Sequence, residues 1–301
     1  MQPHSIRTDL AAEAREIWRE NAAELTEIPG VEAADTSEQG FHVTTVRILN
    51  EAGEKELCKP IGEYVTLELD ALIRREEDAF PRAAQVLAGH IRRLLQLQGK
   101  ERVLVAGLGN SSITPDAIGP EAIHYILVTR HLKQRMPESF GAFREVCALR
   151  TGVLGTTGME SAEVISSLSA QLKPDRIIVI DALASRSTAR LCRTVQLSDT
   201  GIVPGSGVGN HRAALNRQTL GIPVLAIGVP TVDDAATLTI ELLHRAEVDD
   251  AVIERFGADP GMIVTPRDID RSVHDTAKLI GYAVNLAVHD GLTAEDVDLF
   301  L

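Results

Sequence analysis

The sequence is poor in aromatic residues and cysteine, and it has no long apolar run. Aromatic residues make up 3% of the 301 positions, so the core must be built from aliphatic side chains. No stretch approaches the roughly 20 apolar residues of a membrane span, and the first residues lack the apolar segment of a secretory signal. The cysteines Cys58, Cys147 and Cys192 are widely spaced, which argues against a disulfide framework. These features predict a cytoplasmic protein without membrane contact.

Positive charge is also scarce. The chain has 30 Lys and Arg residues against 43 Asp and Glu residues, which gives a formal net charge of −13. An acidic surface repels the phosphates of nucleic acids and anionic lipids. We therefore expect no direct binding to nucleic acid.

Several common catalytic and cofactor motifs are missing. There is no H-E-x-x-H pair, no Cys/His cluster with the spacing of metal ligands and no G-x-S-x-G elbow. A Walker A lysine is absent, and Gly107-Leu-Gly109 lacks the third glycine of the dinucleotide fingerprint. We expect no metal and no cofactor.

The hydrophobic pattern predicts an α/β fold. The first part of the chain has a helix and two strands rich in β-branched residues, and the remainder alternates apolar strands with helices. Continuous apolar strands of this kind are typical of a mostly parallel sheet with helices on both faces, here with an added N-terminal β-hairpin region. Strands are expected at 41–49, 64–69, 103–106, 176–180 and 223–227, and helices at 8–23, 76–97, 120–133, 159–171, 233–245, 267–289 and from Thr293.

Two aspartates follow predicted strands. Asp116 lies in the loop after the strand at 103–106, and Asp181 comes directly after the strand at 176–180. The carboxyl ends of parallel strands meet at one edge of a sheet, where ligand crevices form. Two carboxylates that share a crevice can divide the roles of acid and base, because burial and like charge separate their pKa values. The alternative is that Asp116 caps the next helix and Asp181 fixes a turn.

There are two glycine-rich loops, one directly after the strand at 103–106 and one at 205–210 after the turn-like stretch 199–204. We expect them to line the crevice, where exposed backbone N–H groups could stabilise an oxyanion. The residues concerned are Gly107, Gly109, Asn110, Gly205, Gly207, Gly209 and Asn210.

Long motifs in this order resemble the germination protease family. They are GLGNSSITPDAIGP at 107–120, TRHL at 129–132, IDALASRS at 180–187, DTGIVPGSGVGN at 199–210, LGIPVLAIGVPTVDDA at 220–235 and VTPRDID at 264–270. SIRTDLAAEA at 5–14 and YVTLE at 64–68 match as well. The motifs cover nearly the whole chain.

The resemblance implies a spore endopeptidase that degrades small acid-soluble spore proteins during germination. It implies a fold similar to the maturation proteases of nickel hydrogenases, a homotetramer, and synthesis as a zymogen in the cytoplasm of the spore core. The two essential aspartates of the family fall on Asp116 and Asp181. The resemblance thus implies an atypical aspartic-type peptidase that uses the pair to activate water.

The resemblance also implies autocatalytic removal of a propeptide. Members cut after an acidic residue that follows Thr and precedes an apolar residue and Ala, and Thr8-Asp9-Leu10-Ala11 fits this pattern. Cleavage between Asp9 and Leu10 would leave residues 10–301 as one protease domain. One departure is that residues 246–262 are shorter than the corresponding segment of the family.

Two other functions remain open from the sequence. A metal-assisted peptidase is the nearer alternative, because hydrogenase maturation proteases bind nickel in a corresponding crevice. The other is a non-catalytic protein that holds a small anion in its glycine loops.

Overall fold

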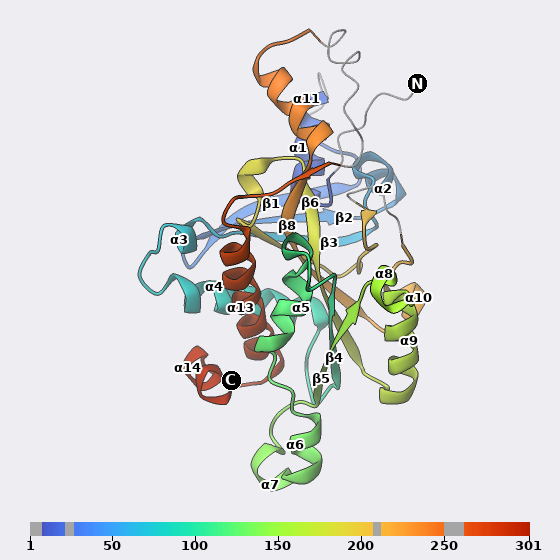
Figure 1. Ribbon diagram of the computed structural model, residues 1–301, viewed down its shortest axis with the longest axis vertical. Coiled ribbons are helices and arrows are strands. Elements are labelled where there is room, and N and C mark those ends of the chain that lie inside the picture. The colour runs from blue at the N-terminus through green and yellow to red at the C-terminus, as the bar shows by residue number, and fades with distance from the viewer. Residues whose placement is uncertain (1–7, 22–26, 207–211, 250–261) are drawn as a thin grey trace.

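A mixed β-sheet forms the centre of the protein (Figure 1). The structure is a computed structural model that describes residues 8–21, 27–206, 212–249 and 262–301. Within these residues the order across the sheet is β1-β2-β3-β7-β8-β6-β4-β5, and β9 pairs with β8. The strands are β1 (Val31–Glu38), β2 (Phe41–Ile48), β3 (Gly62–Glu68), β4 (Val103–Leu108), β5 (Val146–Gly152), β6 (Arg176–Ser185), β7 (Thr194–Ser198), β8 (Val224–Asp234) and β9 (Ile263–Val264).

One half of the sheet is parallel. β4 pairs in parallel with β5 and β6, and β6 pairs in parallel with β8. All six residues of β4 are buried. Val103 and Val105 belong to one apolar cluster and Leu104 and Ala106 to another, because successive side chains of a strand point to opposite faces. The predicted α/β class is therefore confirmed.

Helices cover both faces of this parallel part. α4 (Ala79–Leu95) and α13 (Ile269–Val288) pack on the face of Val103, and α9 (Ser161–Leu172) inserts Ile165 on the opposite face. Figure 1 shows α4 and α13 on one side of the strands and α9 on the other. No helix in the described residues is long and apolar enough to cross a bilayer.

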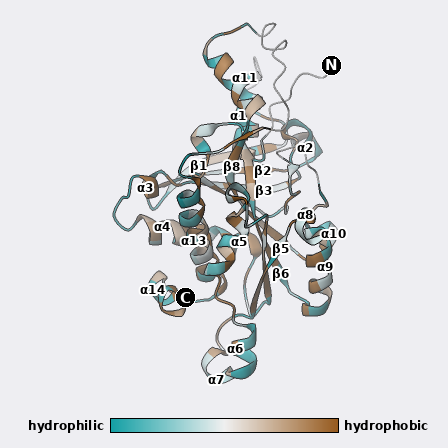
Figure 2. Cartoon of the chain, viewed as in Figure 1, coloured by the Kyte–Doolittle hydropathy of each residue, from teal (hydrophilic) through white to brown (hydrophobic). Residues whose placement is uncertain are grey.

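The other helices are short or lie at the edges of the sheet. Figure 2 shows brown, hydrophobic colour along central strands such as β8, and mainly white and teal on the peripheral α6 and α7. These other helices are α1 (Ala11–Asn21), α2 (Glu51–Leu57), α3 (Asp70–Ile73), α5 (Ile118–Ala122), α6 (Arg130–Arg135), α7 (Pro137–Phe140), α8 (Leu154–Thr157), α10 (Arg217–Leu220), α11 (Ala235–Arg245) and α14 (Ala294–Phe300), with 3-10 turns η1 (Thr114–Asp116), η2 (Ile123–Tyr125) and η3 (Thr188–Arg190).

The N-terminal hairpin region continues the central sheet. β2 pairs with both β1 and β3 in antiparallel fashion, and β3 reaches the core through β7. The strands predicted at 41–49 and 64–69 are present as β2 and β3. β1 was not predicted, because its side chains are polar and mostly exposed and show no apolar alternation.

The helix predicted at 120–133 is wrong as one continuous element. The chain leaves helical geometry after η2 and resumes it only at α6. Between them, the Leu127 N–H donates to the Asn285 side chain of α13 at 2.9 Å, and the Thr129 N–H donates to the Val146 carbonyl of β5 at 3.1 Å. These tertiary hydrogen bonds replace helical ones, which a local pattern cannot reveal.

Candidate active site

Asp181 lies on β6, one residue beyond the point where β4 leaves it. The last parallel pair of these two strands joins Gly107 to Ile180, whereas β6 and β8 remain paired as far as Ser185. The prediction that the strand ends at Ile180 is therefore wrong, because β8 continues to supply hydrogen-bonding partners. A cleft opens beyond the end of β4, beside the extended part of β6, and Asp181 lines it.

Asp116 reaches the same cleft from the loop that follows β4. Its carboxylate Oδ2 accepts a hydrogen bond from the Asn110 N–H at 2.8 Å, which closes the loop on itself. Gly109 has φ +107°, and a Cβ there would lie 2.0 Å from the Asp116 carbonyl oxygen, so this position requires glycine. Asp116 does not cap α5, whose N-cap is Ala117 without a side-chain hydrogen bond.

Both carboxylates line one cavity of about 300 Å³. Its wall also includes Asp9 from the N-terminal segment, Gly205 and Arg212. The structure thus brings together the two aspartates that the sequence singled out, and it adds a third carboxylate and an arginine to the same cavity.

The environment of the pair favours protonation. Burial raises the pKa of Asp181 well above its usual value, and the charges of Asp116 and Asp9 raise it further. Burial also raises the pKa of Asp116, against the hydrogen bond from Asn110 and the charge of Arg212. Two neighbouring carboxyl groups of this kind titrate as a coupled pair.

The segment Thr8–Leu10 enters the cleft in a non-helical conformation. The Asp9 N–H donates to the Ala184 carbonyl at 3.0 Å, and the Ala184 N–H donates to the Asp9 carboxylate at 2.9 Å. The Ser206 hydroxyl donates to the other oxygen of that carboxylate at 2.7 Å. The helix predicted to start at Thr8 begins instead at Ala11, because Asp9 hydrogen-bonds to Ala184 of β6. The peptide bond after Asp9 therefore lies beside the strand that carries Asp181.

Comparison with known proteins identifies the family. A family model described as germination protease matches residues 11–259. The germination proteases of Caldanaerobacter subterraneus subsp. tengcongensis and Clostridium tetani are 44% and 42% identical, covering 98% and 99% of both chains respectively. The chain belongs to the germination protease family. It is accordingly a peptidase, as its motifs suggested.

Two further matches cover a smaller part of this chain. The germination protease of Oceanobacillus iheyensis is 43% identical over 88% of this chain and 74% of its own. Among solved structures, the [NiFe] hydrogenase maturation protease HycI from Thermococcus kodakarensis KOD1 aligns with 65% of this chain and 98% of its own, at 17% identity and a TM-score of 0.36.

Gln196 is a residue of this germination protease family member that no sequence motif marked, and it lines a neighbouring cavity that also includes Asp9. It lies on β7 and is 7% exposed. Its Nε2 donates to the Asp9 carbonyl at 3.2 Å, and its Oε1 accepts from the Ala11 N–H at 2.8 Å. The amide side chain thus spans the Asp9–Leu10 bond. The sequence did not predict this role, because a polar residue on a strand forms no motif. The contact between Gln196 and the N-terminal segment exists only in the folded chain.

The glycine loops contribute unequally. Gly109 and Gly205 line the cavity, whereas Gly107 packs against α5, where a Cβ would meet the Gly119 carbonyl oxygen at 2.3 Å. The Asn110 N–H is already used by Asp116. The prediction that these N–H groups line the crevice is therefore wrong for Gly107 and Asn110. Gly207, Gly209 and Asn210 lie outside the described residues.

The described residues do not offer a donor set for a metal. No group of three or more His, Cys, Asp or Glu side chains has a metal-binding arrangement in the part of the chain that the structure describes. The cavity wall carries three carboxylates there, but no histidine or cysteine side chain among its described residues. We derive no catalytic step through a metal.

Proposed function

We propose that this chain is an autoprocessing endopeptidase in which Asp116 and Asp181 activate water. The observation that carries the proposal is that both carboxylates line one cavity with the Asp9 side chain. A peptidase needs a base that takes a proton from water and an acid that gives one to the carbonyl or the leaving amine. A coupled pair of carboxyl groups supplies both when it holds one proton.

Asp181 is the better place for that proton. Its side chain is the more deeply buried of the two, and two neighbouring negative charges oppose its ionisation. A backbone hydrogen bond and the charge of Arg212 favour the ionised form of both carboxyl groups, so the deeper burial of Asp181 and the negative charges beside it make the difference. In this scheme Asp116 takes the proton from water, and Asp181 donates its proton to the substrate.

The first substrate is the chain itself, cut between Asp9 and Leu10. Two hydrogen bonds to Ala184 hold Asp9 alongside β6, and Gln196 donates to the carbonyl of the bond to be cut. A donor at that oxygen stabilises the negative charge that develops on it during attack. Residues 1–9 would then leave as a propeptide, of which residues 1–7 lie outside the described part.

The later substrates are small acid-soluble spore proteins, degraded during germination. This assignment, a homotetrameric assembly and a location in the spore core rest on the family. Sedimentation of the purified chain measures the assembly. Of the short segment 246–262, residues 250–261 lie outside the described part of the chain.

One incubation tests the proposal. Purified chain is mixed with a small acid-soluble spore protein, and new amino termini are mapped by mass spectrometry. We expect Leu10 as the new terminus of the chain, and cuts after acidic residues in the spore protein. Cuts at unrelated residues would contradict the proposal. Loss of all cleavage after exhaustive chelation, restored by a metal ion, would favour the metal-assisted alternative.

A further inference from the structure

Arg212 lies in the active-site cavity with both aspartates. Among the described residues that line this cavity of about 300 Å³, it is the one cationic side chain, and it shares the wall with Asp9, Asp116 and Asp181. An arginine keeps its charge at any pH at which a protein is folded. Only 25% of this side chain is exposed, so water screens its charge in part. The cavity therefore holds one permanent positive charge among three carboxyl groups.

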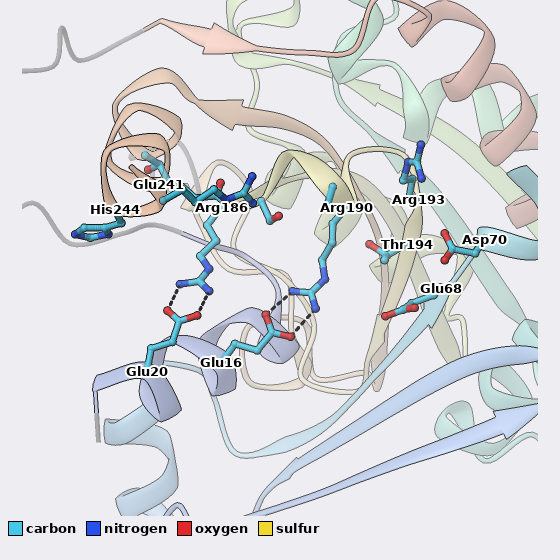
Figure 3. Close-up of a pocket in the computed structure, with 14 residues that line it drawn as sticks. Glu16, Glu20, Glu68, Asp70, Arg186, Arg190, Arg193, Thr194, Glu241 and His244 are labelled. Atoms are coloured by element: carbon cyan, nitrogen blue, oxygen red, sulfur yellow. Dashed lines mark hydrogen bonds and ion pairs between the residues drawn. The ribbon is translucent and has the colours of Figure 1, made fainter. Parts of the chain in front are cut away.

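Arg212 differs from the arginines of a neighbouring surface, whose charges are already matched. Figure 3 shows Arg186 beside Glu20, and Arg190 beside Glu16, at the edge of a cavity of about 850 Å³. Each of these two arginines makes two hydrogen bonds to its glutamate, with a shortest distance of 2.6 Å in both pairs. Such a bidentate pair uses the donors of the guanidinium and balances its charge.

The contact of Arg212 with an acidic residue is looser. Its Nη1 lies 3.7 Å from the Glu160 carboxylate, which is beyond hydrogen-bonding distance. Glu160 is the residue before α9, and its N–H donates to the Glu163 side chain at 3.0 Å. Between described residues this is the one ion pair of Arg212, and it lies outside the cavity wall. Most of the charge of Arg212 is therefore available to the cavity.

The aspartate pair needs a positive charge to divide the roles of acid and base. Burial favours the protonated forms of Asp116 and Asp181, and Asp181 also faces the negative charges of Asp116 and Asp9. A pair that held two protons would offer no base to activate water. A fixed cation nearby lowers the free energy of the ionised state, so it keeps one of the two carboxyl groups charged.

We propose that Arg212 is a positioning residue for the aspartate pair, and that its charge keeps one of the two carboxylates ionised and able to take the proton from water. Arg212 acts through Asp116 and Asp181 and not on the peptide, since the Asp9 carbonyl accepts its hydrogen bond from Gln196. When the propeptide leaves with Asp9, the pair and Arg212 stay together, so the same role applies to later substrates. The inference rests on the proposed function, in which this pair activates water.

The pH profile of self-processing tests this role. The parent chain should give a bell-shaped profile, in which the acid limb reports ionisation of the base and the alkaline limb reports loss of the proton from the acid. Arg212→Gln removes the positive charge and makes both ionisations harder, so both limbs should move to higher pH by about one unit. The rate on the acid limb should then fall by about 10-fold. Arg212→Lys keeps the charge and should return both limbs toward those of the parent.

Arg130→Gln is the matched control. Arg130 begins α6, is paired with Glu145 at 3.2 Å, is 43% exposed and does not line the cleft, so its variant should keep the parent profile. Coincident limbs in the parent and Arg212→Gln overturn the inference even if the rate falls at every pH, because a structural role does not move the limbs. If Arg212→Gln is inactive at every pH, a parent-like profile of Arg212→Lys supports the role, and an inactive Arg212→Lys overturns it.

Direct titration of the carboxyl groups separates failure of this inference from failure of the proposed function. If the parent chain is not processed at any pH, the proposed function fails, and the effect of Arg212 is judged by ¹³C NMR of the aspartate carboxyl groups. The Asp116→Asn and Asp181→Asn chains assign the two signals. Midpoints that move to higher pH by about one unit in Arg212→Gln support the effect of its charge on the pair. Unchanged midpoints overturn it.

Discussion

Two buried carboxylates contact the last part of β6, and their surroundings are opposite. Glu13 accepts hydrogen bonds from Ser185 and from the N–H groups of the two following residues. Among the described residues, Asp181 accepts one hydrogen bond, from the N–H of its own neighbour Ala182, and it faces the negative charge of Asp116. A carboxylate surrounded by donors is an anchor, whereas one that lacks them is held ready to exchange a proton. The same strand provides both within five residues.

Replacing either Asp116 or Asp181 should abolish the proton transfer that we assign to the pair. Asp116→Asn and Asp181→Asn keep the shape of the side chain but cannot share the catalytic proton. We expect self-processing at Asp9–Leu10 to fall by about 10³-fold or more in each variant, as for the loss of a catalytic acid or base. Mass spectrometry of the amino terminus over time measures the rate.

The matched control for these variants is Asp199→Asn. Burial raises the pKa of Asp199 too, but this residue accepts from the Glu63 N–H and does not line the cleft, and an amide oxygen can still accept that bond. Its self-processing should stay within about threefold of the parent rate, as for a surface-like change. Wild-type processing by either cleft variant would refute the roles assigned to the pair.

Gln196 tests whether the N-terminal segment lies in a productive position. Gln196→Ala removes the donor to the Asp9 carbonyl and the acceptor for Ala11. We expect self-processing to slow by about 10²-fold, the usual cost of one donor to a developing oxyanion. Gln196→Glu keeps the acceptor but not the donor, and should be equally slow. A rate restored by the Glu variant would show that Gln196 only orients the helix.

Substitution of Glu13 tests whether its buried carboxylate stabilises the fold. Glu13→Gln places an amide N–H₂ among groups that are themselves donors, so it should lower the free energy of unfolding by about 2 kcal/mol. Glu16→Gln changes a partly exposed pair and should cost less than about 0.5 kcal/mol. Urea denaturation of both variants, in an Asp181→Asn background that prevents processing, gives the difference. Equal stability of the two would remove the anchoring role.

The sequence predicted the elements with strong local signals. The apolar runs of β4, β6 and β8 and the periodic α4 and α13 are present, and the strand-end rule placed Asp116 and Asp181 in one cleft. What it missed depends on contacts between distant segments. β1 has no apolar alternation, and Gln196 acquires its role only because Asp9 lies 187 positions away in sequence and beside it in space.

A third buried carboxylate, Asp233 at the end of β8, extends the comparison. It is fully buried, and neither of its oxygens has a hydrogen-bond partner among the described residues. Burial raises its pKa to about 7, and the negative charges of Glu241 on α11, Glu13 on α1 and Asp234 contribute. Unlike Glu13, whose carboxylate has several donors, Asp233 has in the described part of the chain only the nearby N–H of Asp234, and unlike Asp181 it does not line the cleft. Ionisation of Asp233 should therefore cost stability and serve no catalytic step.

The pH dependence of Asp233→Asn makes this cost measurable. A carboxyl group whose folded pKa is raised stabilises the fold while it is protonated, and that contribution is lost as pH rises from about 4 toward about 7. The Asn variant cannot ionise, so it should exceed the parent by up to about 4 kcal/mol at pH 8 and match it near pH 4. Asp175→Asn should instead lower the free energy of unfolding at pH 8. Arg102 lowers the pKa of Asp175, so the ionised carboxylate stabilises the fold, and the substitution removes this contribution only above that pKa. A gain from Asp233→Asn that is the same at both pH values would mean that the amide finds a hydrogen bond the carboxylate lacks, and that Asp233 is not protonated in the folded chain.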